Sequence, residues 1–167
     1  MRAAVLFIAL LVFAVPAFAQ STPGAGTFGM GAQISGALDV QAPGIMTMSN
    51  GLNGLYCVTN NITLLGGFGL TTTSDVATVF SFNVGGYYRF NRSAFTPIAG
   101  ALIFINVISP SGAGAKSTTQ FGFFLGGGAE YYFNKNFGMS ISEGLQFNTQ
   151  PTTFGFASKV GLNWFFN

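Results

Sequence analysis

A regular alternation of large apolar residues with small or polar ones is the feature that most constrains how this chain can fold. Between Phe80 and Phe90 the even positions are apolar, apart from Gly86, while the odd positions carry Ser, Asn, Gly, Tyr and Arg. The same period of two recurs in three further segments: 28–34, 121–133 and 154–166. A period of two is typical of a β-strand with one apolar face. The sequence therefore predicts an all-β fold.

The shortage of charge indicates that this fold does not face water on all sides. Only 6% of the 167 residues are charged, against roughly 25% in soluble domains. A membrane-spanning helix needs about 20 consecutive apolar residues, and beyond the N-terminal segment the longest apolar run, Ile98 to Ile105, is too short. Such a chain can cross a bilayer only as a closed β-barrel. The soluble alternative, an eight-stranded sandwich, would expose a far larger apolar patch than soluble proteins tolerate.

Turn-forming residues divide the chain into eight predicted strands. Asn-rich turns at 60–61, 91–93 and 134–136 alternate with longer Gly-, Ser-, Thr- and Pro-rich loops near 39–50, 71–75, 109–119 and 149–152. The strands are expected at 27–38, 51–59, 62–70, 77–90, 94–108, 119–133, 137–148 and 153–166, with strand ends least defined in 39–53 and 94–108. The predicted fold class is an eight-stranded antiparallel up-and-down transmembrane β-barrel, with both chain ends on the side of the short turns.

The first 19 residues have the pattern of a secretory signal peptide. Arg2 supplies the positive region, Ala3–Val15 the apolar core, and Ala17-Phe18-Ala19 a small-x-small cleavage site. Cleavage after Ala19 would leave residues 20–167 as the barrel domain. The alternative is an uncleaved membrane anchor, which the short apolar run disfavours. Export combined with a barrel places the expected location in a bacterial outer membrane.

The residue types that most catalytic and binding chemistry needs are scarce. The chain has no histidine and one cysteine, Cys57, which excludes His-based catalysis, CxxC chemistry and intramolecular disulfides. No metal site and no cofactor are expected. With a net charge of +2 and no Lys/Arg cluster, nucleic acid is not an expected partner. We therefore predict a protein without catalytic activity, although a site built from Glu and Lys stays open.

Three segments carry a resemblance to a known family: 64–70 (LLGGFGL), 126–136 (GGGAEYYFNKN) and 159–166 (KVGLNWFF). In them the chain resembles the outer-membrane-protein β-barrel domain family, the small OmpX-like or OmpA-transmembrane-like barrels of Gram-negative bacteria. The resemblance covers essentially the whole mature chain. It implies a structural, surface-interaction or adhesion-type role; the alternative is a narrow porin-like pore or small-ligand transport across the outer membrane.

The resemblance also assigns a role to the last predicted strand. In the family, a terminal strand that ends in an aromatic residue is the signal read by the outer-membrane assembly machinery. The matching residues here are Val160, Leu162, Trp164 and Phe166. One further residue, Asn167, follows the final aromatic.

Three charged residues fall on the inward side of their predicted strands: Arg89, Glu130 and Lys159. An eight-stranded barrel is just wide enough for side chains to fill it, and a lone charge in such an interior is costly. We therefore expect no sizeable channel, and a lumen charge network in which Glu130 accepts hydrogen bonds from both cations. The alternative is three separately hydrated charges.

Glu143 breaks the apolar pattern of the outward side. It is expected to face lipid in line with Ile141 and Leu145, where a carboxylate is unfavourable but tolerated. It is either a tolerated substitution or the mark of a contact with another protein. The other expected partners are outer-membrane lipid and lipopolysaccharide around the wall, and an unknown surface ligand at the external loops, whose composition favours flexibility.

Overall fold

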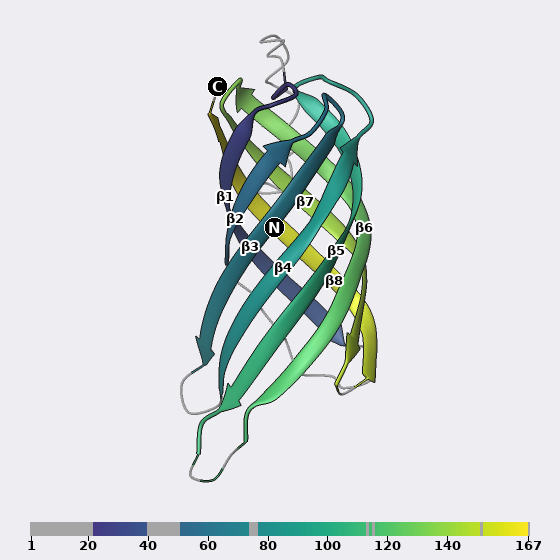
Figure 1. Ribbon diagram of the computed structural model, residues 1–167. Helices are drawn as coiled ribbons and strands as arrows, with labels where there is room; N and C mark the ends of the chain where they lie inside the picture. The colour runs from purple at the N-terminus through teal and green to yellow at the C-terminus, as the bar shows by residue number, and fades with distance from the viewer. Residues whose placement is uncertain are drawn as a thin grey trace, which may run out of the picture.

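The computed structural model is a closed barrel of eight antiparallel strands, each paired with its neighbours in chain order (Figure 1). The structure describes residues 22–39, 51–73, 77–112, 114, 116–150 and 152–166. The strands are β1 (Phe28–Asp39), β2 (Gly51–Cys57), β3 (Ile62–Thr73), β4 (Ala77–Arg89), β5 (Phe95–Pro110), β6 (Thr118–Asn134), β7 (Phe137–Thr149) and β8 (Thr152–Phe166). The predicted all-β, up-and-down barrel is therefore confirmed. The signal peptide predicted at 1–19 lies outside the described residues.

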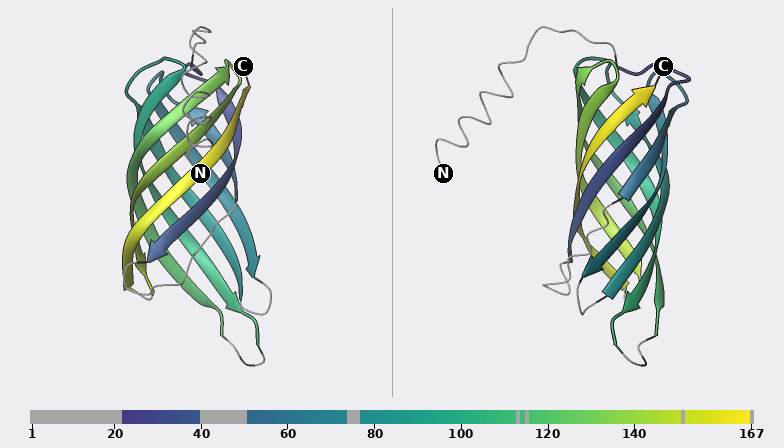
Figure 2. Two further views of the ribbon diagram at one scale, coloured as in Figure 1. Left: turned by 180° about the vertical axis from the view of Figure 1, so that it is seen from behind. Right: turned by 90° about the vertical axis from the view of Figure 1, so that its left-hand side faces the viewer.

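The barrel closes through its first and last strands. β1 pairs with β2 on one side and with β8 on the other, from Phe28 opposite Phe166 to Asp39 opposite Gly155. The strands run obliquely around the barrel, as the two views in Figure 2 show. Each strand of the described chain pairs with two neighbours, so no strand lies at an edge of the sheet, which is what backbone groups in lipid require. Among the described residues, no helix is long and apolar enough to span a membrane.

The two ends of the barrel carry different connections. We call one the turn end: it holds the connections 58–61, 90–94 and 135–136, the first described residues and the end of β8 (Figure 1). Backbone hydrogen bonds join these segments, with Gly26 N donating to Cys57 O at 2.7 Å and Phe165 N donating to Asn136 O at 2.6 Å. We call the opposite end the loop end; of its connections, 40–50 and 74–76 lie outside the described residues.

The predicted alternation of short turns with longer loops is wrong at two of the four loop-end connections, those after β3 and β7. β3 extends through Thr73 and β7 through Thr149, and Thr149 pairs directly with Thr152 of β8. The stretch predicted as a loop at 149–152 is therefore a connection of residues 150–151 alone, shorter than the turn at 90–94. Threonine is β-branched and favours the extended conformation. These threonine-rich segments lengthen the ladder instead of forming loops.

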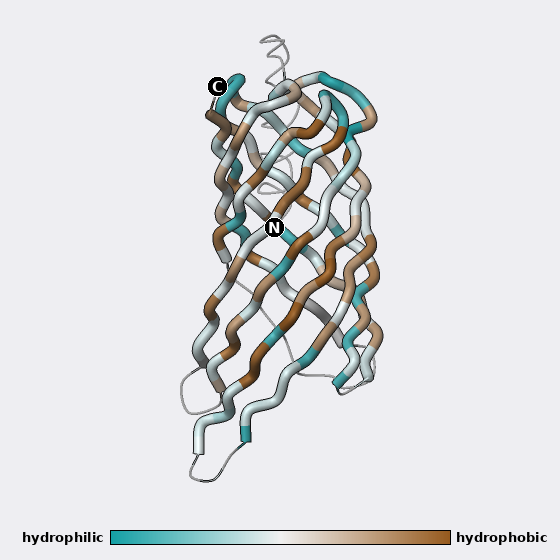
Figure 3. Tube along the Cα trace, viewed as in Figure 1, coloured by the Kyte–Doolittle hydropathy of each residue, from teal (hydrophilic) through white to brown (hydrophobic). Residues whose placement is uncertain are grey.

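The outer face of the barrel is apolar. Large side chains at alternate positions, such as Phe82 and Phe156, are exposed there, and Figure 3 shows hydrophobic stretches interrupted by paler residues along the strands. At the turn end, aromatic rings touch in a row: the ring centroids of Phe133 and Phe137 lie 5.4 Å apart, and those of Phe137 and Trp164 lie 5.6 Å apart. An apolar wall with an aromatic girdle is the surface of a barrel that sits in a lipid bilayer.

We predict that the purified, refolded protein migrates differently in SDS gels before and after heating. The closed ladder keeps its hydrogen bonds in detergent until heat separates the strands, so the unheated protein stays compact. A variant that lacks β8 is the control, because it cannot close and should migrate to one position with or without heating. Identical migration of the heated and unheated full chain would contradict a closed barrel.

Candidate functional site

Inward-facing side chains fill the barrel in three layers. The ion-pair layer, nearest the turn end, consists of Tyr87, Arg89, Glu130 and Tyr132. The apolar layer beyond it consists of Leu65, Leu102, Phe104, Phe124 and Ala157. The amide layer, which continues toward the loop end, consists of Asn53, Ser81, Asn83, Asn106, Gln120 and Asn148. The interior is therefore a stack of packed side chains, and its candidate functional residues are the charged ones.

Arg89 and Glu130 form a buried ion pair at the turn end. Arg89 is the last residue of β4 and Glu130 lies in β6, and both are on the inward side of their strands. β5 lies between them, with Ile98 opposite Arg89 and Thr96 opposite Glu130. Across the narrow interior, Arg89 Nε donates to Glu130 Oε2 at 2.7 Å, and the two side chains are 0% and 2% exposed. A charge pair this deeply buried is stable only if its remaining donors and acceptors are also satisfied.

Two tyrosines and the single cysteine satisfy those remaining groups. Tyr87 OH donates to Glu130 Oε1 at 2.7 Å, and Tyr132 OH donates to Glu130 Oε2 at 2.6 Å. Arg89 Nη2 donates to Tyr87 OH at 3.1 Å, and Arg89 Nη1 lies 3.5 Å from Cys57 Sγ. Every guanidinium nitrogen and both carboxylate oxygens therefore have a partner. Sequence analysis did not assign these three residues to the ion pair, although their inward positions near the two charges were a visible signal.

Lys159 does not join this pair, which corrects the predicted network. Among the described residues, Glu130 has Arg89 as its ion-pair partner, whereas Lys159 Nζ lies over the Phe124 ring, 3.9 Å from its centroid. Lys159 is paired with Ser142 of β7 and Glu130 with Ser140. The tilt of the strands carries β8 still further toward the loop end. The ammonium group therefore lies closer to the loop end than the ion pair does, within the apolar layer.

Polar side chains beyond the apolar layer are only partly paired with one another. Asn106 Nδ2 donates to Gln120 Oε1 at 3.3 Å, and Asn148 Nδ2 donates to Thr153 Oγ1 at 2.9 Å. Within the described part of the chain, three buried oxygens have no hydrogen-bond partner: Asn53 Oδ1, Ser81 Oγ and Asn83 Oδ1. These oxygens border small cavities, where water is the usual partner of such groups.

The N-terminal segment covers the turn end. Thr22 is 2% exposed, and Arg92 Nε donates to Thr22 Oγ1 at 3.2 Å. Ala25 N donates to Asn60 Oδ1 at 3.1 Å. Gly26 adopts a positive φ of 83°, which a residue with a side chain rarely adopts, and this bend leads the chain into β1. The segment and the ion-pair layer together fill this end of the barrel.

The remaining candidate residues lie on the outer face. Val160, Leu162, Trp164 and Phe166 of β8 are all exposed to the outside of the wall; their role in assembly stays a prediction. Glu143 is also exposed, with Gly127 and Ser158 as its cross-strand partners. No group of three His, Cys, Asp or Glu side chains in the described segments is placed to hold a metal ion.

Solved structures with a similar fold include those of three outer-membrane barrels. The N-terminal β-barrel domain of Pseudomonas aeruginosa OprF is 17% identical with a TM-score of 0.63, covering 84% of this chain and 99% of that one. Neisserial surface protein A is 16% identical with a TM-score of 0.61, covering 83% and 95%. The outer membrane protein OprG from Pseudomonas aeruginosa is 13% identical with a TM-score of 0.52, covering 87% and 98%. No protein-family model and no curated protein matches the sequence.

We predict that Glu130→Ala destabilises the barrel by about 3–5 kcal/mol, the range for removing one partner of a buried pair. The substitution leaves the Arg89 guanidinium buried without a counter-charge. The measurement is urea unfolding of the protein refolded into lipid vesicles. Adding Arg89→Met should restore part of the loss, whereas adding Lys159→Met should only add the effect of that substitution. Rescue by Lys159→Met instead would show that Glu130 pairs with Lys159.

We predict that Glu143→Leu stabilises the barrel in lipid by about 1–2 kcal/mol, because an acidic side chain on the lipid face costs somewhat less than Arg or Lys there. The same unfolding measurement applies. Glu143→Gln is the matched control: it keeps the size of the side chain and removes its charge, so it should give a smaller gain. A clear loss of stability in Glu143→Leu would reveal a structural contact of the carboxylate.

Proposed function

We propose that this protein is a non-enzymatic integral protein of the bacterial outer membrane, and that its barrel anchors external loops instead of forming an open channel. The chain shares its eight-stranded fold with outer-membrane barrels. The observation that carries the proposal is the filled interior. The Arg89–Glu130 pair and the tyrosines around it close the lumen at the turn end.

The outer surface supports a location in lipid. Exposed Phe, Leu, Ile and Val side chains cover the wall, and an aromatic row lies at the turn end, as expected at a membrane interface. The proposed partners are outer-membrane lipid and lipopolysaccharide along this wall, and the assembly machinery at β8. Any specific surface ligand would bind at the loop end, because the wall is committed to lipid and binding residues are concentrated on loops.

The chemistry of the interior supports a role without catalysis. The sequence contains no histidine, and both oxygens of Glu130 accept hydrogen bonds from Arg89, Tyr87 and Tyr132. A general base must be within reach of a substrate proton, and a carboxylate enclosed by three donors is not. We therefore propose a structural, surface-interaction or adhesion-type role.

Current through a planar lipid bilayer tests whether the barrel is an anchor or a conduit. We predict that the wild-type protein shows no stable open state of substantial conductance, because side chains fill the lumen. The comparison variant is Arg89→Ser with Glu130→Ser, which removes the bulk of the ion-pair layer and should conduct more than the wild type. A stable, substantial conductance of the wild-type barrel would overturn the proposal and favour a narrow porin-like pore or small-ligand transport.

A further inference from the structure

The environment of Lys159 differs from that of the other buried cation. Arg89 has a carboxylate, a hydroxyl and a thiol around it. Lys159 Nζ instead lies over the face of the Phe124 ring, 3.9 Å from its centroid. An aromatic face compensates a buried ammonium group only in part, and a buried charge without a counter-charge is costly. The lumen therefore contains an amine that has no carboxylate partner among the described residues.

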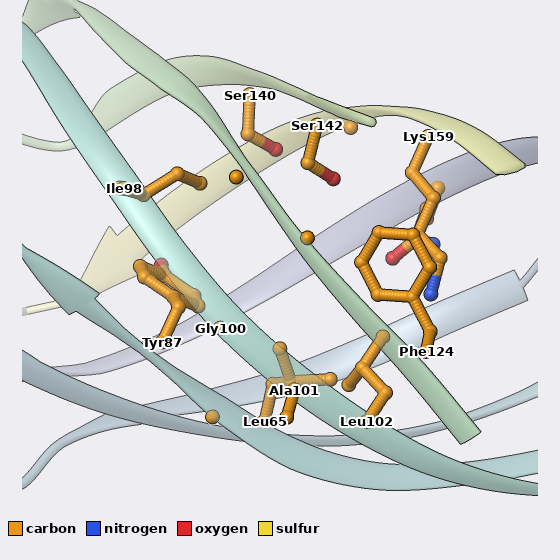
Figure 4. A pocket seen from close by; sticks show the side chains of 15 residues that line it. Leu65, Tyr87, Ile98, Gly100, Ala101, Leu102, Phe124, Ser140, Ser142 and Lys159 are labelled. Carbon is orange, nitrogen blue, oxygen red and sulfur yellow. The ribbon is translucent and has the colours of Figure 1, made fainter. Parts of the chain in front are cut away.

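Lys159 also borders a cavity, and the polar groups beside it are hydrogen-bond donors. Figure 4 shows Lys159, Ser142 and Ser140 along one side of this cavity. The Ser142 hydroxyl and the Gln33 amide nitrogen, which also line it, donate to no described residue. Ser140 Oγ accepts a hydrogen bond from Asn163 Nδ2 at 3.3 Å, which leaves its own proton free to donate. No carboxylate lies among the described residues that line the cavity.

The opposite wall of the same cavity is apolar. Leu65 and Leu102 lie across from the serines, Ile98 lies beside Ser140, and Phe124 closes one end (Figure 4). Gly161 keeps the space beside Ser140 open, because a Cβ at this position would lie 2.8 Å from Ser140 Oγ. A cavity with an apolar wall and a few convergent polar groups is the usual form of a small-molecule site.

A second cavity connects Lys159 with the amide layer. It is lined by polar side chains that include Ser81, Asn106 and Gln146, and it shares Gln33 and Lys159 with the first. A small polar molecule could therefore approach Lys159 from the amide layer, on the side away from the ion-pair layer. The carboxylate of Glu130 is not available to compete, because its own partners occupy both of its oxygens.

From this arrangement we infer that the lumen binds a short-chain monocarboxylate at Lys159. The carboxylate oxygens accept hydrogen bonds from the Lys159 ammonium group, the Ser142 hydroxyl and the Gln33 amide. Hydrogen bonds in which both groups are charged are the strongest of these. The alkyl chain lies against Leu102 and Ile98, where burial of apolar surface is favourable. The site requires no open channel and is independent of the anchoring role.

Calorimetric titration of the refolded barrel with sodium propionate, in a zwitterionic detergent at fixed ionic strength, tests this inference. Saturable binding is expected for the wild type. Lys159→Met should weaken it at least tenfold, and Ser142→Ala should weaken it several-fold. Lys116→Met, which changes an exposed lysine of the β5–β6 connection, is the matched control and should bind as the wild type does. The gel shift on heating verifies that each variant is folded.

Two ligand comparisons use the wild-type protein alone, so they test the proposed carboxylate site even if Lys159→Met does not refold. Propionamide has the same shape without the charge and should not bind. Chloride has the charge without the alkyl chain and should bind more weakly than propionate. The inference is overturned if propionate shows no saturable binding, if propionamide binds equally well, if chloride binds as tightly, or if folded Lys159→Met binds like the wild type.

Discussion

Hydrogen bonding of the backbone between β1 and β8 is the constraint on which the rest of this structure depends. Lipid offers no hydrogen bonds to an open strand edge, so a chain with this apolar surface must pair its first strand with its last. Once the ring is closed, each residue of a strand faces either lipid or the lumen, with no third environment. The alternation of apolar with small or polar residues follows from this division. The large apolar side chains cover the outside, and the polar and charged ones must be accommodated in a narrow interior.

That narrow interior explains why the charged residues have such different surroundings. Arg89 and Glu130 lie close enough to touch, and each finds additional partners in Tyr87, Tyr132 and Cys57. Lys159 is on the same inward side but beside Phe124. Removal from water is offset for the pair by short charge-assisted hydrogen bonds. For Lys159, the cost of removal from water is offset by the face of the Phe124 ring and by any ligand bound in the cavity beside it.

The sequence predicts well which residues of a strand face lipid and which face the lumen. It predicts poorly how residues of different strands are placed relative to one another along the barrel axis. All eight strands were predicted close to their observed positions, and Arg89, Glu130 and Lys159 were correctly placed on the inward face, because the period of two is visible in the residues themselves. The pairing of Glu130 was predicted only in part. Its partners depend on strand tilt and register, which are properties of the closed ring and not of any one segment. The loop predicted at 149–152 is wrong for a different, local reason, because its threonines favour the extended conformation and join the ladder.

The pairing of β1 with β8 also bears on how the chain reaches its folded state. Phe28 and Phe166 are direct partners although they lie near opposite ends of the sequence, and contacts between distant segments form slowly. Until β8 is in place, both β1 and the most recently added strand present unpaired edges, which are templates for pairing with other chains. An incomplete barrel is therefore prone to aggregate, and that hazard ends only when the last strand docks. A chain built in this way depends on being held apart from its copies until it is complete.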